Sequence, residues 1–71
     1  MIPIEHYWSE DKPTLEDVKF AYNRASQGVV VEIRWFVKYS GHYNRLVTPN
    51  DTEDMNAETY FNEIIPKCYP V

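Results

Sequence analysis

The sequence contains few of the residues from which catalytic and metal-binding sites are usually built. It has one cysteine, two histidines and two glycines among 71 residues. The single Cys68 excludes an internal disulfide, and one cysteine with two histidines does not match the ligand sets of structural zinc sites. Two glycines are too few for a loop that cradles a phosphate group. We therefore expect no enzyme, no metal site and no small-molecule cofactor.

A long apolar run is also missing. No segment approaches the roughly 20 apolar residues that a membrane-spanning helix needs. Residues 1–6 have neither the basic start nor the apolar stretch of a signal peptide. We therefore expect a cytoplasmic protein that makes no contact with a membrane.

What the chain does contain is typical of a single folded domain spanning residues 1–71. Apolar residues make up 44% of the sequence and aromatic residues 15%, which is too apolar for a disordered chain. A chain of this length buries only about 60% of its unfolded surface. The aromatic side chains compensate, because each can bury roughly 150–250 Å². Formation of a homodimer would compensate in a second way.

The net charge of −4 is unevenly distributed along the sequence. Residues 28–48 carry three basic side chains against the single acid Glu32, whereas the rest of the chain carries four basic and ten acidic ones. An acidic body argues against binding of nucleic acid over the whole surface, although residues 28–48 could contact it locally. The reverse alternative is an acidic surface that docks on a basic partner.

A helix is expected to begin at Thr14. Thr14, followed three residues later by Asp17, resembles a capping box with the shorter acid. Gly28 stands where a left-handed residue often follows the end of a helix. Phe20 lies opposite the apolar stripe, where a sheet edge or a terminus would cover it or a partner would contact it. The stripe itself has helical spacing and consists of Leu15, Val18, Ala21, Tyr22 and Ala25.

Residues 29–48 predict a long β-hairpin. Two-residue turns at residues 40–41 or 41–42 give two alternative registers, which pair Leu46 with Trp35 or with Val37. The faces of the first strand are the same in both. Alternation assigns a core face to Val29, Val31, Ile33, Trp35, Val37 and Tyr39, and the opposite face to Val30, Glu32, Arg34, Phe36 and Lys38.

Proline residues divide the rest of the chain. Pro49 ends the second strand, residues 50–54 are expected to form a loop, and a second helix runs from about residue 55 or 56 to Ile65, where Pro66 stops it. The buried stripe of this helix is expected to contain Ala57, Tyr60, Phe61 and Ile64.

The order of these elements predicts the fold class. Residues 2–8 alternate weakly through Ile2, Ile4, His6 and Trp8, so they could add a short strand that Pro3 restricts to a sheet edge. The order (β)-α-β-β-α predicts an α+β two-layer sandwich, with an antiparallel hairpin sheet and two helices on one face. If the N-terminal strand joins the sheet, the first β-α-β unit is a right-handed crossover.

The hairpin face that points away from the core is the strongest candidate for a binding surface. It combines aromatic and basic side chains, including the residue types that usually anchor protein interfaces. The same aromatic side chains could stack on the bases of single-stranded nucleic acid, and the basic ones could pair with its phosphates. A solvated sheet face and a dimer interface are further interpretations. The candidate residues are Arg34, Phe36 and Lys38, with either Tyr43 and Arg45 or His42 and Asn44 from the second strand, and the first of these pairs is preferred.

An acidic cluster, Asp51, Glu53 and Asp54, precedes the second helix. It does not match a calcium-binding loop, because Met55 stands where an oxygen ligand is expected and no glycine follows. Helix capping and stabilisation of the helix dipole explain these residues. Contact with a basic partner is the alternative.

These observations predict a non-enzymatic protein-interaction module, an inhibitor or adaptor of the type that phages and other mobile elements encode. Its partner would be another protein or a second copy of the chain, bound through the hairpin at residues 29–48. The alternative is a single-stranded nucleic-acid-binding protein that uses the same surface.

Overall fold

The computed structural model describes residues 3–70. These residues form three strands, three α-helices and one 3₁₀ turn. The N-terminal alternation forms a strand from Ile4 onward, whereas Ile2 lies outside the described residues. In chain order the elements are β1 (Ile4–Ser9), α1 (Leu15–Ala25), β2 (Val30–Val37), β3 (Gly41–Val47), α2 (Pro49–Asp54), α3 (Ala57–Glu63) and η1 (Ile65–Lys67).

The strands form one mixed sheet in the order β1-β2-β3. β1 pairs with β2 in parallel, so that Ile4 lies beside Val30 and Ser9 beside Trp35, and β2 pairs with β3 antiparallel. Parallel neighbours need a crossover connection, which α1 supplies. The expected α+β class is confirmed. The sheet is wider than the predicted antiparallel hairpin, because β1 joins it as a parallel edge strand.

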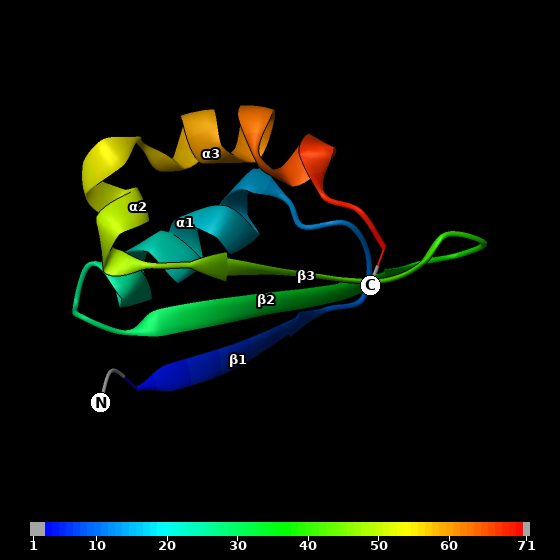
Figure 1. The fold of residues 1–71 in the computed structure, drawn as a ribbon, viewed down its shortest axis with the longest axis horizontal. Coiled ribbons are helices and arrows are strands. Elements are labelled where there is room, and N and C mark those ends of the chain that lie inside the picture. Colours follow the sequence, from blue (N-terminus) through cyan, green and yellow to red (C-terminus); the bar gives the residue numbers. More distant parts are fainter. Residues whose placement is uncertain (1–2, 71) are drawn as a thin grey trace.

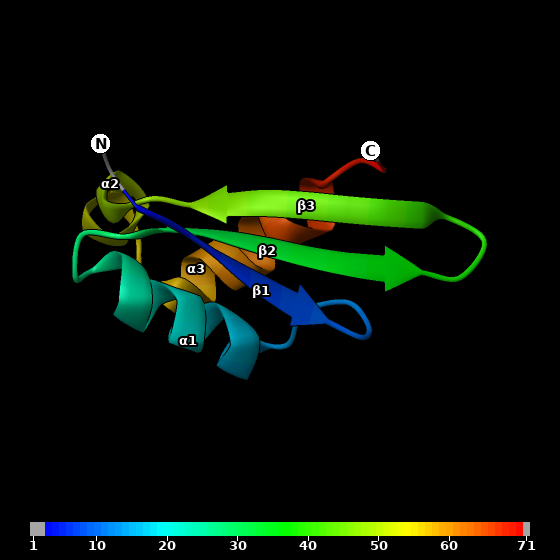
Figure 2. The ribbon, with the colours of Figure 1, turned by 90° about the horizontal axis from the view of Figure 1, so that it is seen from below.

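The helices lie together on one side of the sheet. Figure 1 shows α3 above the strands and α1 passing behind β3, and Figure 2, seen from below, shows the strands in front of α3. The tip of the β2–β3 hairpin extends past the helices (Figure 1). Within the described chain, the lower side of the sheet carries no helix (Figure 2).

The first helix begins where the sequence predicts it. The Thr14 hydroxyl accepts a hydrogen bond from the backbone N–H of Asp17 at 3.3 Å, and the Asp17 carboxylate accepts one from the backbone N–H of Thr14 at 2.8 Å. Val18 and Ala21 of the predicted stripe are fully buried. Gly28, beyond the helix end, has a φ of +96°, a left-handed conformation that glycine adopts without steric cost.

The loop predicted at residues 50–54 is wrong, because this segment belongs to the short helix α2. Thr48 and Asp51 form a second capping box, in which the Thr48 hydroxyl accepts from the Asp51 N–H at 3.2 Å and the Asp51 carboxylate accepts from the Thr48 N–H at 2.9 Å. Pro49 lies in the first turn, where its missing N–H needs no partner. The predicted second helix divides into α3 and η1, which contains Pro66.

The core fills the space between the sheet and the helices. Tyr60 of α3 connects the two layers, because its hydroxyl donates a 2.8 Å hydrogen bond to the backbone carbonyl of Leu46 in β3. Burial raises the pKa of Tyr60 to about 12, although Arg45 opposes the shift, so the hydroxyl stays protonated at neutral pH. The buried residues of the core are Val18, Ala21, Ala25, Val31, Ile33, Trp35, Val47, Tyr60 and Ile65.

Both predicted registers of the hairpin are wrong. The structure pairs Trp35 with Tyr43, so the connection contains three residues, 38–40. Tyr39 lies in this loop with a φ of 70° and is 95% exposed, so its predicted place on the core face is also wrong. A three-residue loop pairs odd-numbered with odd-numbered positions, whereas a two-residue turn pairs odd with even. The two faces of β3 are therefore exchanged relative to the preferred expectation.

Candidate binding face of the sheet

The helix-free side of the sheet is the candidate functional surface (Figure 2). Residues that pair directly across neighbouring strands point to the same face, so the register fixes its members. We name this surface the open face. It consists of Ile4, His6 and Trp8 of β1, Val30, Glu32, Arg34 and Phe36 of β2, and His42, Asn44 and Leu46 of β3.

Large apolar side chains are exposed on this face. Ile4 is 58% exposed, Trp8 55%, Phe36 41% and Leu46 48%. Single exposed apolar residues are common on protein surfaces, but a group of them on one face is typical of an interaction site. The open face therefore carries four large apolar side chains that are about half exposed to water.

Three rings gather on the open face. The His42 ring lies 4.9 Å from the ring of Phe36 and 6.4 Å from that of Trp8, measured between centroids. Trp8 and His42 come from the two edge strands, so this group reaches across the whole sheet. Aromatic side chains offer a large contact area with few rotatable bonds, which suits them to anchor a partner.

A small polar network occupies the centre of the open face. The Nδ1 atom of His6 lies 2.8 Å from one carboxylate oxygen of Glu32, and the side-chain amide of Asn44 donates to the other at 3.2 Å. The Nε atom of Arg34 is 4.0 Å from Glu32. The Arg34 side chain is 57% exposed and that of Glu32 only 18%. The open face thus presents an accessible cation beside a largely covered anion.

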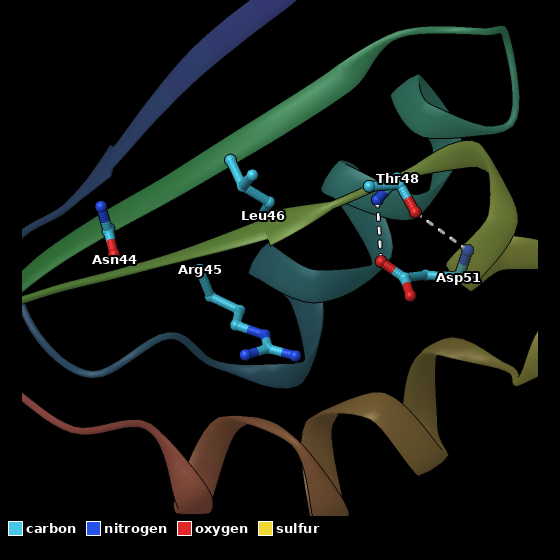
Figure 3. Close-up of a pocket in the computed structure, with 5 residues that line it drawn as sticks. All are labelled: Asn44, Arg45, Leu46, Thr48 and Asp51. Atoms are coloured by element: carbon cyan, nitrogen blue, oxygen red, sulfur yellow. Dashed lines mark hydrogen bonds between the residues drawn. The ribbon is translucent and has the colours of Figure 1, made fainter.

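Two residues predicted for the binding surface lie on the other face. Tyr43 stacks on Trp35 on the helix-covered side, with ring centroids 5.4 Å apart and planes 5° apart. The Arg45 side chain points from β3 toward α3 (Figure 3). The alternative assignment of the second strand is the one that the register supports: the open face carries His42 and Asn44.

The remaining predicted residues divide between the open face and the turn. Arg34 and Phe36 lie on the open face as predicted, whereas Lys38 lies in the loop that follows β2, with its Nζ atom 5.3 Å from the centroid of the Tyr39 ring. Because Arg45 and Lys38 lie elsewhere, Arg34 is the one fixed cation among the ten open-face residues.

The sequence did not indicate that β1 contributes to this surface. The shared parity of Ile4, His6 and Trp8 was the available signal. The alternation of these residues does not show which strand β1 pairs with, or whether that pairing is parallel or antiparallel. Both must be known before the three side chains can be placed beside Arg34 and Phe36.

Phe20 is a large exposed aromatic residue on the helical side. It is 52% exposed, and its ring centroid lies 5.3 Å from that of Tyr7 in the edge strand β1. The interpretation that the sheet edge covers Phe20 is therefore confirmed in part, because one side of the ring has this contact.

A hollow of about 410 Å³ lies along the free edge of β3 (Figure 3). The Asp51 carboxylate at its rim accepts a hydrogen bond from the Thr48 backbone, as a dashed line shows, so Asp51 caps α2, whereas Asn56 caps the later helix that the acidic cluster was expected to cap. Glu53 and Asp54 are exposed on α2. The residues that line the hollow are Asn44, Arg45, Leu46, Thr48 and Asp51.

Among the described residues, the potential metal ligands are dispersed and the Cys68 thiol is favoured in its neutral form. Within residues 3–70, no group of three or more His, Cys, Asp or Glu side chains is placed to hold a metal ion. The Sγ atom of Cys68 lies 3.5 Å from the backbone carbonyl of Ile64, and burial raises the pKa of its thiol, with Arg45 opposing the shift. The reactive thiolate is therefore disfavoured at neutral pH.

Comparison with known proteins gives no family assignment. No protein-family model, no curated protein and no solved structure matches the chain. Among the helices of the described residues, none is long and apolar enough to cross a membrane. The interpretation of the open face therefore depends on its own geometry and chemistry.

Proposed function

We propose that this chain is a non-enzymatic protein-interaction module that binds a protein partner through the open face. The observation that supports this best is the group of four large, half-exposed apolar side chains on a sheet face without helices. Trp8 and Phe36 provide rigid anchors, and Arg34 stands beside them with an accessible guanidinium group. Trp and Arg are among the residues that most often dominate the binding energy of protein interfaces.

The charges on the open face favour a protein over a nucleic acid. Proteins that bind single strands combine stacking rings with several cations that neutralise phosphates. The rings are present in Trp8 and Phe36, but Arg34 is the one fixed cation of the face and Glu32 lies 4.0 Å from it. Binding of a single strand is therefore an outcome that the experiment must distinguish, and a protein is the partner that we propose.

Position-specific photo-crosslinking in the native host tests this proposal. A photoreactive amino acid replaces Asn44 on the open face or, as a control, Lys19 on the exposed side of α1. We expect a discrete protein adduct from position 44 and none from position 19, because only the first probe lies at the proposed interface. Adducts to nucleic acid instead of protein, or the same adducts from both positions, would contradict the proposal.

A matched pair of aromatic substitutions sharpens this experiment. Phe36→Ala removes an anchor of the open face, whereas Phe20→Ala removes a ring of similar exposure on the helical side. We expect Phe36→Ala to reduce the adduct at position 44 roughly tenfold or more, the scale of a residue that dominates an interface. Phe20→Ala should leave it unchanged. Circular dichroism of both variants would verify that the fold is retained.

A further inference from the structure

The distribution of charge bears on the identity of the partner. The chain has a net charge of −4, yet its open face contains one fixed cation, Arg34, and one fixed anion, Glu32. The excess of negative charge therefore lies elsewhere on the molecule. Two copies could meet through their open faces while their acidic surfaces remain in water and apart from each other, so that like-charge repulsion is small.

We propose, building on the function above, that the open face binds a second copy of this chain in a two-fold symmetric dimer. A two-fold interface brings the same patch together from both subunits, so the patch must be complementary to itself. The open face meets this condition at its centre, because Arg34 and Glu32 are alternate residues of the central strand β2 and carry opposite charges.

The arrangement of these two residues selects one symmetry axis. A two-fold axis that runs parallel to the sheet, midway between the two facing sheets, perpendicular to the strands and level with the midpoint between Glu32 and Arg34, lays β2 antiparallel over its copy. Arg34 then faces the partner subunit's Glu32, and this pair occurs twice. The same rotation places Phe36 over the partner subunit's Val30. An axis parallel to β2 and midway between the two sheets would instead place Glu32 against the partner subunit's Glu32, and like charges in direct opposition are unfavourable.

The size of the face sets the expected strength of the dimer. Three strands spaced about 4.8 Å apart, with a rise of about 3.3 Å per residue, present a patch of roughly 14 by 26 Å. With side-chain relief, the two subunits would bury on the order of 1,000 Å², which is the lower limit of specific interfaces. We therefore expect a reversible dimer with a Kd in roughly the micromolar range.

Sedimentation equilibrium of the purified chain measures this association directly. We expect the average mass to rise from that of one chain to that of two as the concentration increases through the micromolar range. A chain that stays monomeric up to about 1 mM, a thousandfold above a micromolar Kd, would overturn the dimer. That result would leave the crosslinking experiment intact, because a position-44 adduct with a different protein would still support the proposed function.

A charge exchange tests the axis itself. In Arg34→Glu, each new carboxylate faces the partner subunit's Glu32, and in Glu32→Arg each new guanidinium faces the partner subunit's Arg34. Each variant alone should dimerise roughly tenfold or more weakly than the original chain, since close like charges across an interface repel each other. An equimolar mixture should recover a heterodimer, because both facing pairs are then of opposite sign.

Control variants separate this local effect from a change in net charge. Lys19→Glu on α1 changes the net charge by the same amount as Arg34→Glu, and Glu63→Arg on α3 matches Glu32→Arg. Both should dimerise like the original chain. A dimer that persists in both open-face variants would overturn the proposal, as would a mixture that recovers no heterodimer. Circular dichroism would show that every variant is folded.

Discussion

Trp35 and Phe36 are neighbours in β2, yet they lie in different environments. Trp35 is 2% exposed and stacks on Tyr43 on the helix-covered side, whereas Phe36 is 41% exposed and contacts His42 on the open face. Both faces of the strand carry apolar side chains. What differs is the layer above them, which is present on one face and absent on the other in the described chain. Apolar composition alone therefore does not mark a core.

Polar side chains show the same contrast. On the covered side they connect the sheet to α1: Arg24 donates two hydrogen bonds to Glu5, at 2.9 and 2.6 Å, and the Tyr7 hydroxyl donates to Asp17 at 2.6 Å. On the open face the polar groups connect the strands to one another through His6, Glu32 and Asn44. The polar groups of one face thus attach a second layer, whereas those of the other link the strands within the sheet.

The largest effect on stability is expected from a comparison of two substitutions at adjacent positions, one on each face of β2. Trp35→Ala should lower the free energy of unfolding by about 3–5 kcal/mol, because it leaves a cavity in the core. Phe36→Ala should cost less than about 1 kcal/mol, because much of this ring is already in water. Urea denaturation followed by circular dichroism measures both values. Equal losses of unfolding free energy would contradict the distinction between a buried Trp35 and an exposed Phe36.

An intermediate effect is expected from the hydroxyl that joins α3 to β3. Tyr60→Phe should cost about 1–2 kcal/mol at neutral pH, since the Leu46 carbonyl loses its partly buried donor. The matched control is Tyr69→Phe, which removes a hydroxyl from an exposed ring and should change stability little. If the two substitutions had the same effect, the hydrogen bond would not hold the layers together.

The same residue predicts the response to alkaline pH. Burial, opposed in part by Arg45, raises the pKa of Tyr60 from 10.0 to about 12, so the fold favours the neutral phenol. Its contribution is fully present below pH 10 and is lost as the pH rises toward 12. In urea titrations between these values, Tyr60→Phe should lose less stability than the original chain. A steeper fall of stability with pH in Tyr60→Phe than in the original chain would contradict this role of the Tyr60 hydroxyl.

The smallest effect is expected at the hairpin tip, which belongs to neither face. Tyr39 holds a φ of 70° and is almost fully exposed, a conformation that costs a residue with a side chain roughly 1–2 kcal/mol. Tyr39→Gly removes this strain but gains chain entropy in the unfolded state, so we expect a net stabilisation of up to about 1 kcal/mol. Thermal unfolding measures the change. A lower midpoint temperature would show that the ring of Tyr39 contributes more than the strain costs.

The sequence predicts the elements better than their relative placement. The apolar stripe of α1 and the alternation of β2 are local patterns that the burial of Val18, Val31 and Ile33 confirms. The capping box of α1 is a third local pattern, which the hydrogen bonds between Thr14 and Asp17 confirm. The helix α2 was missed, although Thr48 and Asp51 have the same spacing as the box that predicted α1. Its polar composition was interpreted as a loop.

The candidate site could be predicted only in part, because it depends on the register of β3. A tyrosine with positive φ gives no signal in the sequence, where Gly or Asn would usually mark such a turn. The unexpected three-residue loop exchanged the faces of β3, and with them the positions of Tyr43 and Arg45. The contribution of β1 depends on a parallel pairing across α1, which no short stretch of sequence encodes.

The parallel pairing of β1 with β2 also orders the events of folding. The β2–β3 hairpin closes over three residues, and such local pairings form within about 1–10 μs. β1 can join only after the chain through α1 has folded back, and closure of this longer connection is slower. We therefore expect Trp8 to reach Arg34 late and the open face to be completed near the end of folding. A partner that contacts Trp8 and Phe36 together would bind the finished fold and not the hairpin that precedes it.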